Sequence, residues 1–244
     1  MRSIRHLPLI ALLIGLAASS VYAGEIQRLR VDLDGDGVPD LVLLSTSKAK
    51  EDWRKRLTVG IAKSRYSDDY FAADGDIPEV RVIAIDRKRK ERQLLVGTPE
   101  AGSCVFHLLS FTSKRLSLLL RFDSGPSCLP PTPQGDGTVS VSTWQGFWNK
   151  NDTYRLTPDG RALMLEERDE YFVNASGSAG NGLTLQDATC PARTIAPGTF
   201  IRVKVFDPKA NRYLLESADG GCGWLPAEEV KTPEDILLNL PWAG

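Results

Sequence analysis

Short apolar or alternating segments, separated by turn residues, follow one another along most of the chain. Each segment is bounded by glycine, proline, aspartate or asparagine, a pattern that is typical of β-strands. Before residue 170 they are residues 27–32, 41–46, 57–63, 80–85, 93–97, 104–112, 116–122, 139–144, 152–156 and 163–167. Residues 47–56 are the best candidate for a short helix, although their charged side chains also suit a polar loop. The pattern predicts a mainly β protein with antiparallel sheets.

Small and glycine-rich residues interrupt this pattern at residues 175–182 and predict a flexible linker. We therefore expect one β domain over residues 24–174 and a second, smaller one over residues 183–244. The second domain begins with clear strand patterns at residues 200–205 and 212–217. Further along, Thr232 and Pro233 predict the N-cap and the first residue of a short C-terminal helix.

The first 23 residues have the features of a secretory signal peptide. Arg2 and Arg5 supply a positive start, residues 7–18 are apolar but short, and Val21-Tyr22-Ala23 suits cleavage before Gly24. No later apolar run approaches the roughly 20 residues that cross a bilayer. Removing the two arginines leaves 28 basic and 31 acidic residues, a net charge of −3 that argues against a nucleic-acid partner. We expect an exported protein, periplasmic or secreted.

The run from Val31 to Asp40 carries most of the recognisable chemistry. Its four carboxylates alternate with glycines and lie at Asp32, Asp34, Asp36 and Asp40. Like charges this close repel one another, and hard oxygen ligands on a tight loop suit calcium. The alternate aspartates and the backbone carbonyl of Val38 are the predicted ligands. The alternative is a solvated Asp/Gly turn without a metal.

This run resembles the D-x-D-G-D-G-x-x-D loop of FG-GAP and VCBS-type β-propeller repeats. An EF-hand fits less well, because its twelfth loop position would be Leu43 instead of a glutamate. The resemblance implies a calcium loop between two strands of a propeller blade, with a structural role for the metal. Residues 85–96 overlay residues 33–44 as a degenerate copy in which Arg92 replaces Asp40, unless the similarity is due to chance. The domain would then be a reduced propeller, or an open or sandwich-like β domain.

The C-terminal segment resembles a bacterial SH3-like (SH3b) barrel. The resemblance covers residues 183–231 and is carried by Gly198-Thr199 and by Gly223-Trp224-Leu225 after a glycine turn. It implies a small barrel in which Trp224 lines a shallow peptide groove, although this tryptophan could equally belong to the barrel core. Because SH3b domains often bind cell-wall peptides, the resemblance also implies a role at the cell envelope.

Four cysteines fit an oxidising compartment and allow three pairings. We favour Cys104 with Cys128 and Cys190 with Cys222, because each pair then lies within one expected domain. The alternatives are a metal site or a reactive thiol. A zinc site would want close pairs such as C-x-x-C, which the sequence lacks.

Few residues point to catalysis. His107, the only histidine after the signal peptide, lies on an apolar strand, and no hydrolase, zinc-protease or Walker motif is present. The acidic run Glu166, Glu167, Asp169 and Glu170 could in principle serve a glycosidase, but such runs are usually solvated. Trp144 and Trp148 fill a core or line a ligand groove.

The two resemblances together imply a non-catalytic exported binding protein. Its ligand would be peptidoglycan or a protein that attacks the cell wall, and calcium would be its structural cofactor. Two other hypotheses remain open at this point. One is an envelope hydrolase whose acid residues are not identified, and the other is a structural partner in an envelope complex.

Overall fold

The computed structural model describes residues 25–46, 54–61, 64–72, 79–100, 102–112, 115–187 and 194–238. These residues are mainly β-strand, which confirms the predicted class. The predicted signal peptide, residues 1–23, lies outside the described residues, and so does most of the segment 47–56. The end of that segment is a strand instead of the expected helix, because residues 54–56 begin β3 and pair with β2 and β4.

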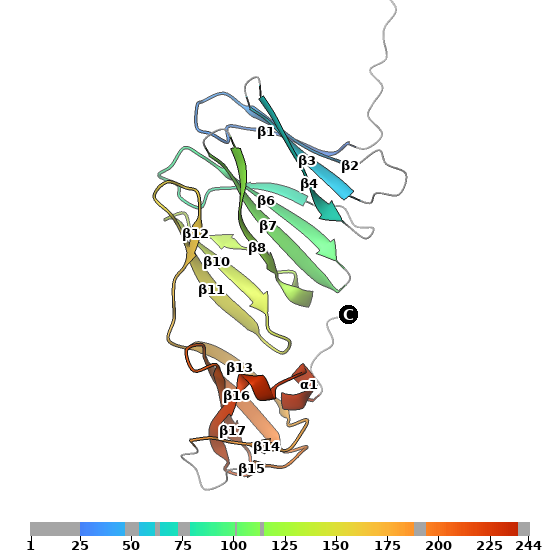
Figure 1. Ribbon diagram of the computed structural model, residues 1–244, viewed down its shortest axis with the longest axis vertical. Coiled ribbons are helices and arrows are strands. Elements are labelled where there is room, and N and C mark those ends of the chain that lie inside the picture. The colour runs from blue at the N-terminus through green and yellow to red at the C-terminus, as the bar shows by residue number, and fades with distance from the viewer. Residues whose placement is uncertain are drawn as a thin grey trace, which may run out of the picture.

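Three four-stranded antiparallel meanders follow one another along the chain, and each pairs its strands in sequence order. The first contains β1 (Glu25–Val31), β2 (Asp40–Thr46), β3 (Arg54–Ile61) and β4 (Ser64–Ala72). The second contains β5 (Glu79–Ile83), β6 (Gln93–Glu100), β7 (Ser103–Thr112) and β8 (Arg115–Asp123). The third contains β9 (Thr132–Pro133), β10 (Thr138–Trp144), β11 (Asn149–Leu156) and β12 (Leu163–Leu165). Figure 1 shows these sheets one below another.

The second meander is the middle layer of the stack. Leu94 and Val96 of β6 pack with Val42 and Leu44 of the first sheet, whereas Leu95 packs toward the third. A strand that is buried on both faces needs a continuous apolar run instead of alternation. This is why β6 and β7 contain such runs, and why the stack has two separate cores, one on each side of the second sheet.

The hairpins that open the first and second meanders have the same internal geometry. Leu33 and Ile85 are both fully buried. Their backbone N–H groups donate to the side chains of the residues that begin the next strand, Asp40 Oδ2 at 2.8 Å and Gln93 Oε1 at 3.0 Å. Gln93, not Arg92, therefore holds the place of Asp40. The ungapped overlay was off by one residue there, because the second loop is one residue longer.

A backbone hydrogen bond joins each hairpin to the next meander at the same place. The N–H of Arg92 donates to the carbonyl of Leu33 at 3.0 Å, and the N–H of Gly137 donates to the carbonyl of Ile85 at 2.9 Å. Both donors directly precede the second strand of their meander. The loops that open the first two meanders are thus each joined to the following meander by an equivalent backbone hydrogen bond.

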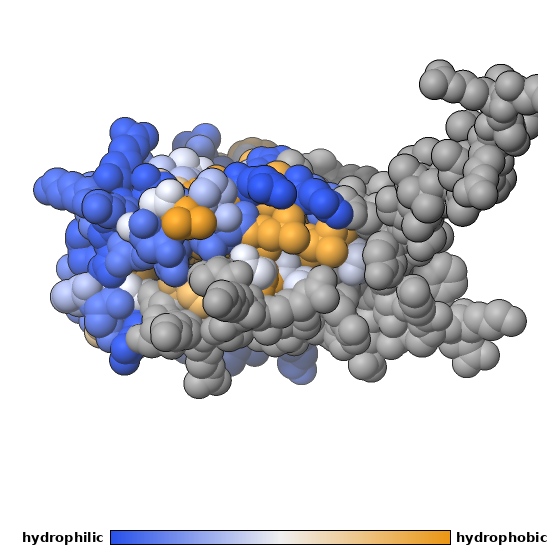
Figure 2. All heavy atoms as spheres, turned by 90° about the horizontal axis from the view of Figure 1, so that it is seen from above, coloured by the Kyte–Doolittle hydropathy of each residue, from blue (hydrophilic) through white to orange (hydrophobic). Residues whose placement is uncertain are grey.

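The outer face of the first meander combines basic and apolar residues. Leu41 and Leu43 are partly exposed there and pair with Arg30 and Arg28. In the second meander the corresponding pairs are Leu94 with Val82 and Val96 with Val80, all apolar. Figure 2, which views this end of the molecule, shows apolar atoms bordered by hydrophilic ones. Arginines in place of valines suit a terminal repeat, whose outer face must tolerate water.

A fourth sheet lies at the other end of the molecule (Figure 1). Its order is β13 (Tyr171–Ser178), β16 (Phe200–Asp207), β17 (Arg212–Ser217) and β18 (Cys222–Pro226), beside a two-stranded pair of β14 (Leu183–Thr184) and β15 (Thr194–Ile195). Within the described residues this sheet does not close into a barrel. The predicted C-terminal helix is confirmed as α1 (Pro233–Ile236), with the Asp235 side chain accepting from the N–H of Thr232 at 2.7 Å.

The residues expected to form a flexible linker belong instead to this sheet. Residues 175–178 complete β13 and pair with residues 200–203 of β16. Ala179 is fully buried. Its N–H donates to the carbonyl of Thr199 at 2.8 Å, and its carbonyl accepts from the N–H of Gly198 at 2.7 Å, in the turn before β16. Backbone pairing outweighs the small side chains here, so the prediction of a linker at residues 175–182 was wrong.

The tip of the β10–β11 hairpin joins the stack to the fourth sheet. Phe147 and Trp148 belong to the hydrophobic core of that sheet, together with Tyr171 and Tyr213. A side chain on Gly146 would collide with the ring of Pro233 in α1, since a Cβ there would lie 2.8 Å from that ring. The two predicted domains therefore share a packed core.

Candidate functional site

Two glycines shape the acidic loop between β1 and β2. Gly35 has φ +80° and Gly37 has φ +88°, the left-handed region that glycine adopts without steric cost. This curvature turns their N–H groups toward Asp32, whose Oδ1 accepts from Gly35 at 2.7 Å and whose Oδ2 accepts from Gly37 at 2.8 Å. The loop thus closes around one carboxylate.

Three of the four predicted carboxylates lie together. Asp32, Asp34 and Asp40 each offer one oxygen, and these oxygens all lie within 4.8 Å of one another. Asp36 is not part of this group, and its Oδ1 accepts from the N–H of Val38 at 2.7 Å. Both Asp36 and Val38 are exposed. The metal site suggested by the geometry is therefore smaller than the predicted set of five residues.

Asp40 is the electrostatically unusual member of the group. It is only 3% exposed, and the charged form of a carboxyl is disfavoured by loss of water. Burial is the main cause that raises the pKa of Asp40, and the charges of Asp34, Asp36 and Asp32 raise it further. The hydrogen bond from Leu33 opposes this shift but does not cancel it. A cation beside Asp40 would relieve both the desolvation and the repulsion.

Among the described residues, no basic side chain forms an ion pair with Asp32, Asp34 or Asp40. The neighbouring loop, residues 84–92, contains five lysines and arginines, yet in the described part of the chain no ion pair joins the two loops. The donor set is three hard carboxylates on a tight turn, which fits calcium, with backbone carbonyls and water completing its six to eight ligands. Asp32, Asp34 and Asp40 are thus the residues that could hold a metal.

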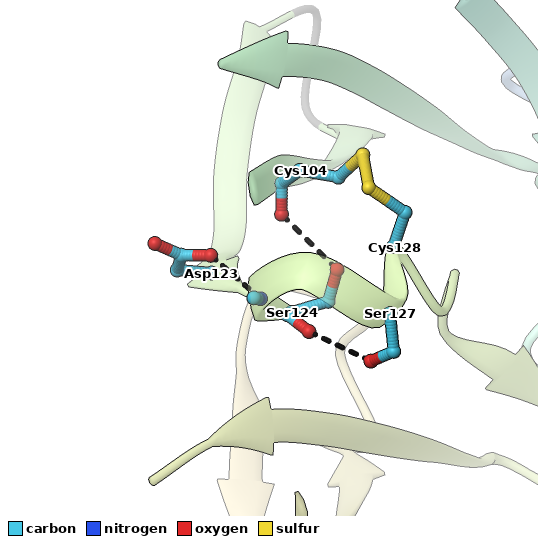
Figure 3. The surroundings of a disulfide bond; sticks show 6 residues. Cys104, Asp123, Ser124, Ser127 and Cys128 are labelled. Carbon is cyan, nitrogen blue, oxygen red and sulfur yellow. Dashed lines mark hydrogen bonds between the residues drawn. A yellow bond between two sulfur atoms is a disulfide. The ribbon is translucent and has the colours of Figure 1, made fainter. Parts of the chain in front are cut away.

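One predicted disulfide is confirmed. Cys104 at the start of β7 is bonded to Cys128, 24 residues later, just after the turn η1 (Gly125–Ser127). As Figure 3 shows, Ser124 Oγ donates to the carbonyl of Cys104 at 3.1 Å, and Ser127 Oγ donates to that of Ser124 at 3.2 Å. Cys222 also forms a disulfide, and its predicted partner, Cys190, lies outside the described residues.

The aromatic candidates have different surroundings. Of the two interpretations of Trp148, the structure supports the core, since this residue is 5% exposed and lies in the core of the fourth sheet. Trp144 is half-buried and packs over Gly125. Trp224 is partly exposed, and the guanidinium of Arg212 lies 4.3 Å from the centre of its ring. Asp187 accepts from Arg212 at 3.0 Å, so the stacked pair has an anionic neighbour.

The candidates for catalysis lie apart from one another. His107 is buried in β7, where burial above all, and the charge of Arg121, lower its pKa to about 4. In the acidic run, Glu166 pairs with Arg155 at 2.6 Å and Asp169 pairs with Lys209 at 2.6 Å. Each of these two carboxylates thus has its own basic partner.

Sequence reasoning missed a buried polar contact between the third and fourth sheets. The Tyr171 hydroxyl donates to Asp152 Oδ1 at 2.6 Å, and Lys150 Nζ donates to Asp152 Oδ2 at 3.1 Å. Burial above all, and then the hydrogen bond to Asp152, raise the pKa of Tyr171, so this phenol stays protonated as a donor. The only sequence signal was a carboxylate within a predicted strand.

None of the helices in the described residues is both long and apolar enough to cross a bilayer. No protein-family model matches the chain, and no curated protein or solved structure matches it either.

Proposed function

We propose that the chain is an exported, non-catalytic binding protein of the bacterial cell envelope whose N-terminal stack is held by a structural calcium ion. The observation that carries the calcium part is the convergence of Asp32, Asp34 and Asp40 within 4.8 Å, with Asp40 buried among like charges. The disulfide between Cys104 and Cys128 supports export, because such bonds persist in oxidising compartments.

Asp32, Asp34 and Asp40 would hold the ion. Its positive charge would offset the repulsion among the carboxylates and fix the turn that begins β2. Asp40 also binds the N–H of Leu33, a residue of the core between the first and second sheets. Holding this carboxylate in its charged form would therefore stabilise the packing of the first sheet.

Replacing Asp34 by Asn should lower the melting temperature in millimolar calcium and have little effect in chelator. The variant removes one charged ligand but keeps a side chain of the same size. A ligand that binds only the folded state at 100 times its Kd stabilises by about 2.7 kcal/mol. For a chain of this size that corresponds to roughly 5–11 °C of melting temperature.

Asp36→Asn is the matched control, since its carboxylate accepts from Val38 and lies outside the group. Thermal unfolding of both variants, with and without chelator, checks the prediction. Equal melting of wild type and Asp34→Asn in calcium would refute a stabilising metal.

The proposed ligand is peptidoglycan or a protein that attacks it. The best-supported contact surface is the outer face of the fourth sheet, where Trp224 is partly exposed and carries the stacked Arg212. The exposed part of this aromatic surface suits carbohydrate rings, whereas the charge of Arg212 is already met by Asp187 at 3.0 Å and Asp207 at 3.5 Å. For the catalytic alternative, Glu166 and Asp169 are each already paired with a basic side chain, Arg155 and Lys209.

Sedimentation of the mature protein with purified peptidoglycan tests this proposal. We expect co-sedimentation that Trp224→Ala weakens about tenfold, whereas Phe200→Ala, an exposed aromatic of the same sheet, leaves it unchanged. Release of soluble muropeptides would instead favour the hydrolase. If the protein neither sediments nor captures a cell-wall hydrolase, the binding role is wrong.

A further inference from the structure

We infer that Arg92 acts as a built-in cation that orders the basic loop, residues 84–92. The acidic loop, residues 32–40, packs against this ordered loop and is held in position by it. Arg92 is then a positioning residue for the calcium site. The calcium part of this inference rests on the proposed function, whereas the ordering of the two loops does not.

The guanidinium of Arg92 is turned back onto its own loop. Its Nη1 donates to three consecutive backbone carbonyls, those of Arg89 at 2.8 Å, Lys90 at 3.0 Å and Glu91 at 3.0 Å. A bound cation likewise draws several carbonyl oxygens of a loop toward one positive centre. Hydrogen bonds from a charged donor are also stronger than neutral ones.

The two homologous hairpins thus differ in the source of their positive charge. Both keep the buried apolar residue, Leu33 or Ile85, and the side-chain acceptor that caps its N–H, Asp40 or Gln93. In the second hairpin the acceptor is a neutral amide and the cation is covalently attached as Arg92. In the first hairpin the acceptor is a carboxylate among other carboxylates, and no side chain supplies the cation within the described residues.

The ordered basic loop contacts the acidic loop directly. The N–H of Arg92 donates to the carbonyl of Leu33 at 3.0 Å. A Cβ placed on Gly35 would lie 2.6 Å from the Cβ of Lys90 and 3.3 Å from the N of Glu91. The backbone of Gly35 therefore rests on the same Lys90–Glu91 segment whose carbonyls Arg92 holds. The position of the carboxylates thus depends on the order of the basic loop.

Arg89 provides a matched control in the same loop. Its Nη1 donates to the carbonyl of Pro158 at 2.7 Å, in the turn between β11 and β12. It carries the same charge as Arg92, but its side chain contacts the third meander and the Glu91 carboxylate, which lies 3.5 Å from its Nε. Arg92→Met and Arg89→Met therefore remove equal charge from the basic loop, but only Arg92→Met removes the donor to the three loop carbonyls.

Hydrogen exchange of the two variants in chelator tests, without any metal, whether the ordered basic loop holds the acidic loop in position. We expect amides of both residues 84–92 and residues 32–40 to exchange about tenfold faster or more in Arg92→Met, a loss equivalent to about 1.4 kcal/mol. In Arg89→Met the acidic loop should exchange as in wild type. Unchanged exchange of residues 32–40 in Arg92→Met would overturn the inference.

Two glycine variants test, through their calcium affinity, whether the contact between the two loops positions the carboxylates. This test does not depend on Arg92. Gly35→Ala and Gly37→Ala both place alanine at positive φ, so both pay the same kind of backbone strain. Only Gly35→Ala adds a methyl group against Lys90, since a Cβ on Gly37 meets nothing within 4 Å. Titration calorimetry should give a calcium Kd at least about tenfold weaker for Gly35→Ala than for Gly37→Ala.

The outcomes separate the inference from the proposed function. Equal calcium affinity of the two glycine variants would contradict the claim that the basic loop positions the acidic loop, while leaving the metal site intact. A wild-type protein that binds no calcium would refute the proposed calcium role. The exchange measurement in chelator would then be the only test of whether the basic loop holds the acidic loop in position.

Discussion

Trp148→Ala should lower the free energy of unfolding by about 3–5 kcal/mol, the usual cost of deleting a buried tryptophan side chain. Trp148 is 5% exposed and touches rings from three strands of the fourth sheet, with centroid distances of 5.8 Å to Phe206, 6.3 Å to Tyr171 and 6.5 Å to Tyr213. Because it comes from the β10–β11 hairpin, its removal also weakens the join between the stack and the fourth sheet. The cavity left by Trp148 would therefore lie where the β10–β11 hairpin packs into the core of the fourth sheet.

Phe172→Ala is the control for this variant. Phe172 follows Tyr171 on β13 but is 85% exposed, so its truncation should change the free energy of unfolding by less than about 0.5 kcal/mol. Denaturant unfolding of the two variants, followed by tryptophan fluorescence and by circular dichroism, measures both effects. A similar small loss in the two variants would contradict a shared core.

Acid should destabilise the protein through His107 by about 3 kcal/mol between pH 6.5 and pH 4. Burial and the nearby charge of Arg121 lower the pKa of His107 from 6.5 to about 4 in the folded chain. The unfolded chain therefore takes up a proton first, and each pKa unit is worth about 1.4 kcal/mol. The stabilisation is complete above pH 6.5, falls as the pH decreases and is lost once the pH is below 4.

His107→Gln isolates this effect because glutamine does not titrate. The difference in free energy of unfolding between wild type and variant should shrink or reverse as the pH falls from 7 to 4. Denaturant unfolding at several pH values in chelator measures this difference. A constant difference across the range would mean that His107 is protonated as easily in the folded protein as in the unfolded chain.

The strand pattern was predictable because most strands carry their own local signal. Alternating or continuous apolar runs place β1, β2, β6, β7, β16 and β17 almost at their observed bounds. Strands without such a signal were not predicted, among them β4 and β13. β13 contains Ala175, Gly177 and two serines, residues that are typical of linkers, and it is a strand only because β16 supplies its hydrogen-bond partners. Pairing over a long sequence separation has no local signature.

The acidic loop was predicted in position but not in detail. Alternation at Asp32, Asp34 and Asp36 suggested that all three side chains point inward, yet Asp36 folds back to accept from Val38. A short side chain can always choose a nearby N–H in a turn, and spacing does not reveal that choice. Likewise, an ungapped overlay could not show that the basic loop is one residue longer, which assigns Gln93 to the place of Asp40.

The burial of Trp148 depended on a partner that the sequence does not place. Its segment, Trp144 to Trp148, suits a core as well as a groove, and the choice is made by the fourth sheet packing against the hairpin tip. The same holds for the contact between Asp152 and Tyr171, which were both expected in the N-terminal domain but lie in different sheets. Contacts between sheets are set by the whole chain, so local patterns could not predict them.

A crystal structure of the mature protein grown in millimolar calcium would test the central claim most directly. We predict one ion at the focus of Asp32, Asp34 and Asp40, with carboxylate oxygens at roughly 2.3–2.6 Å from it. The opposite result, with those side chains turned outward into water and only solvent between them, would contradict a calcium-organised stack of sheets.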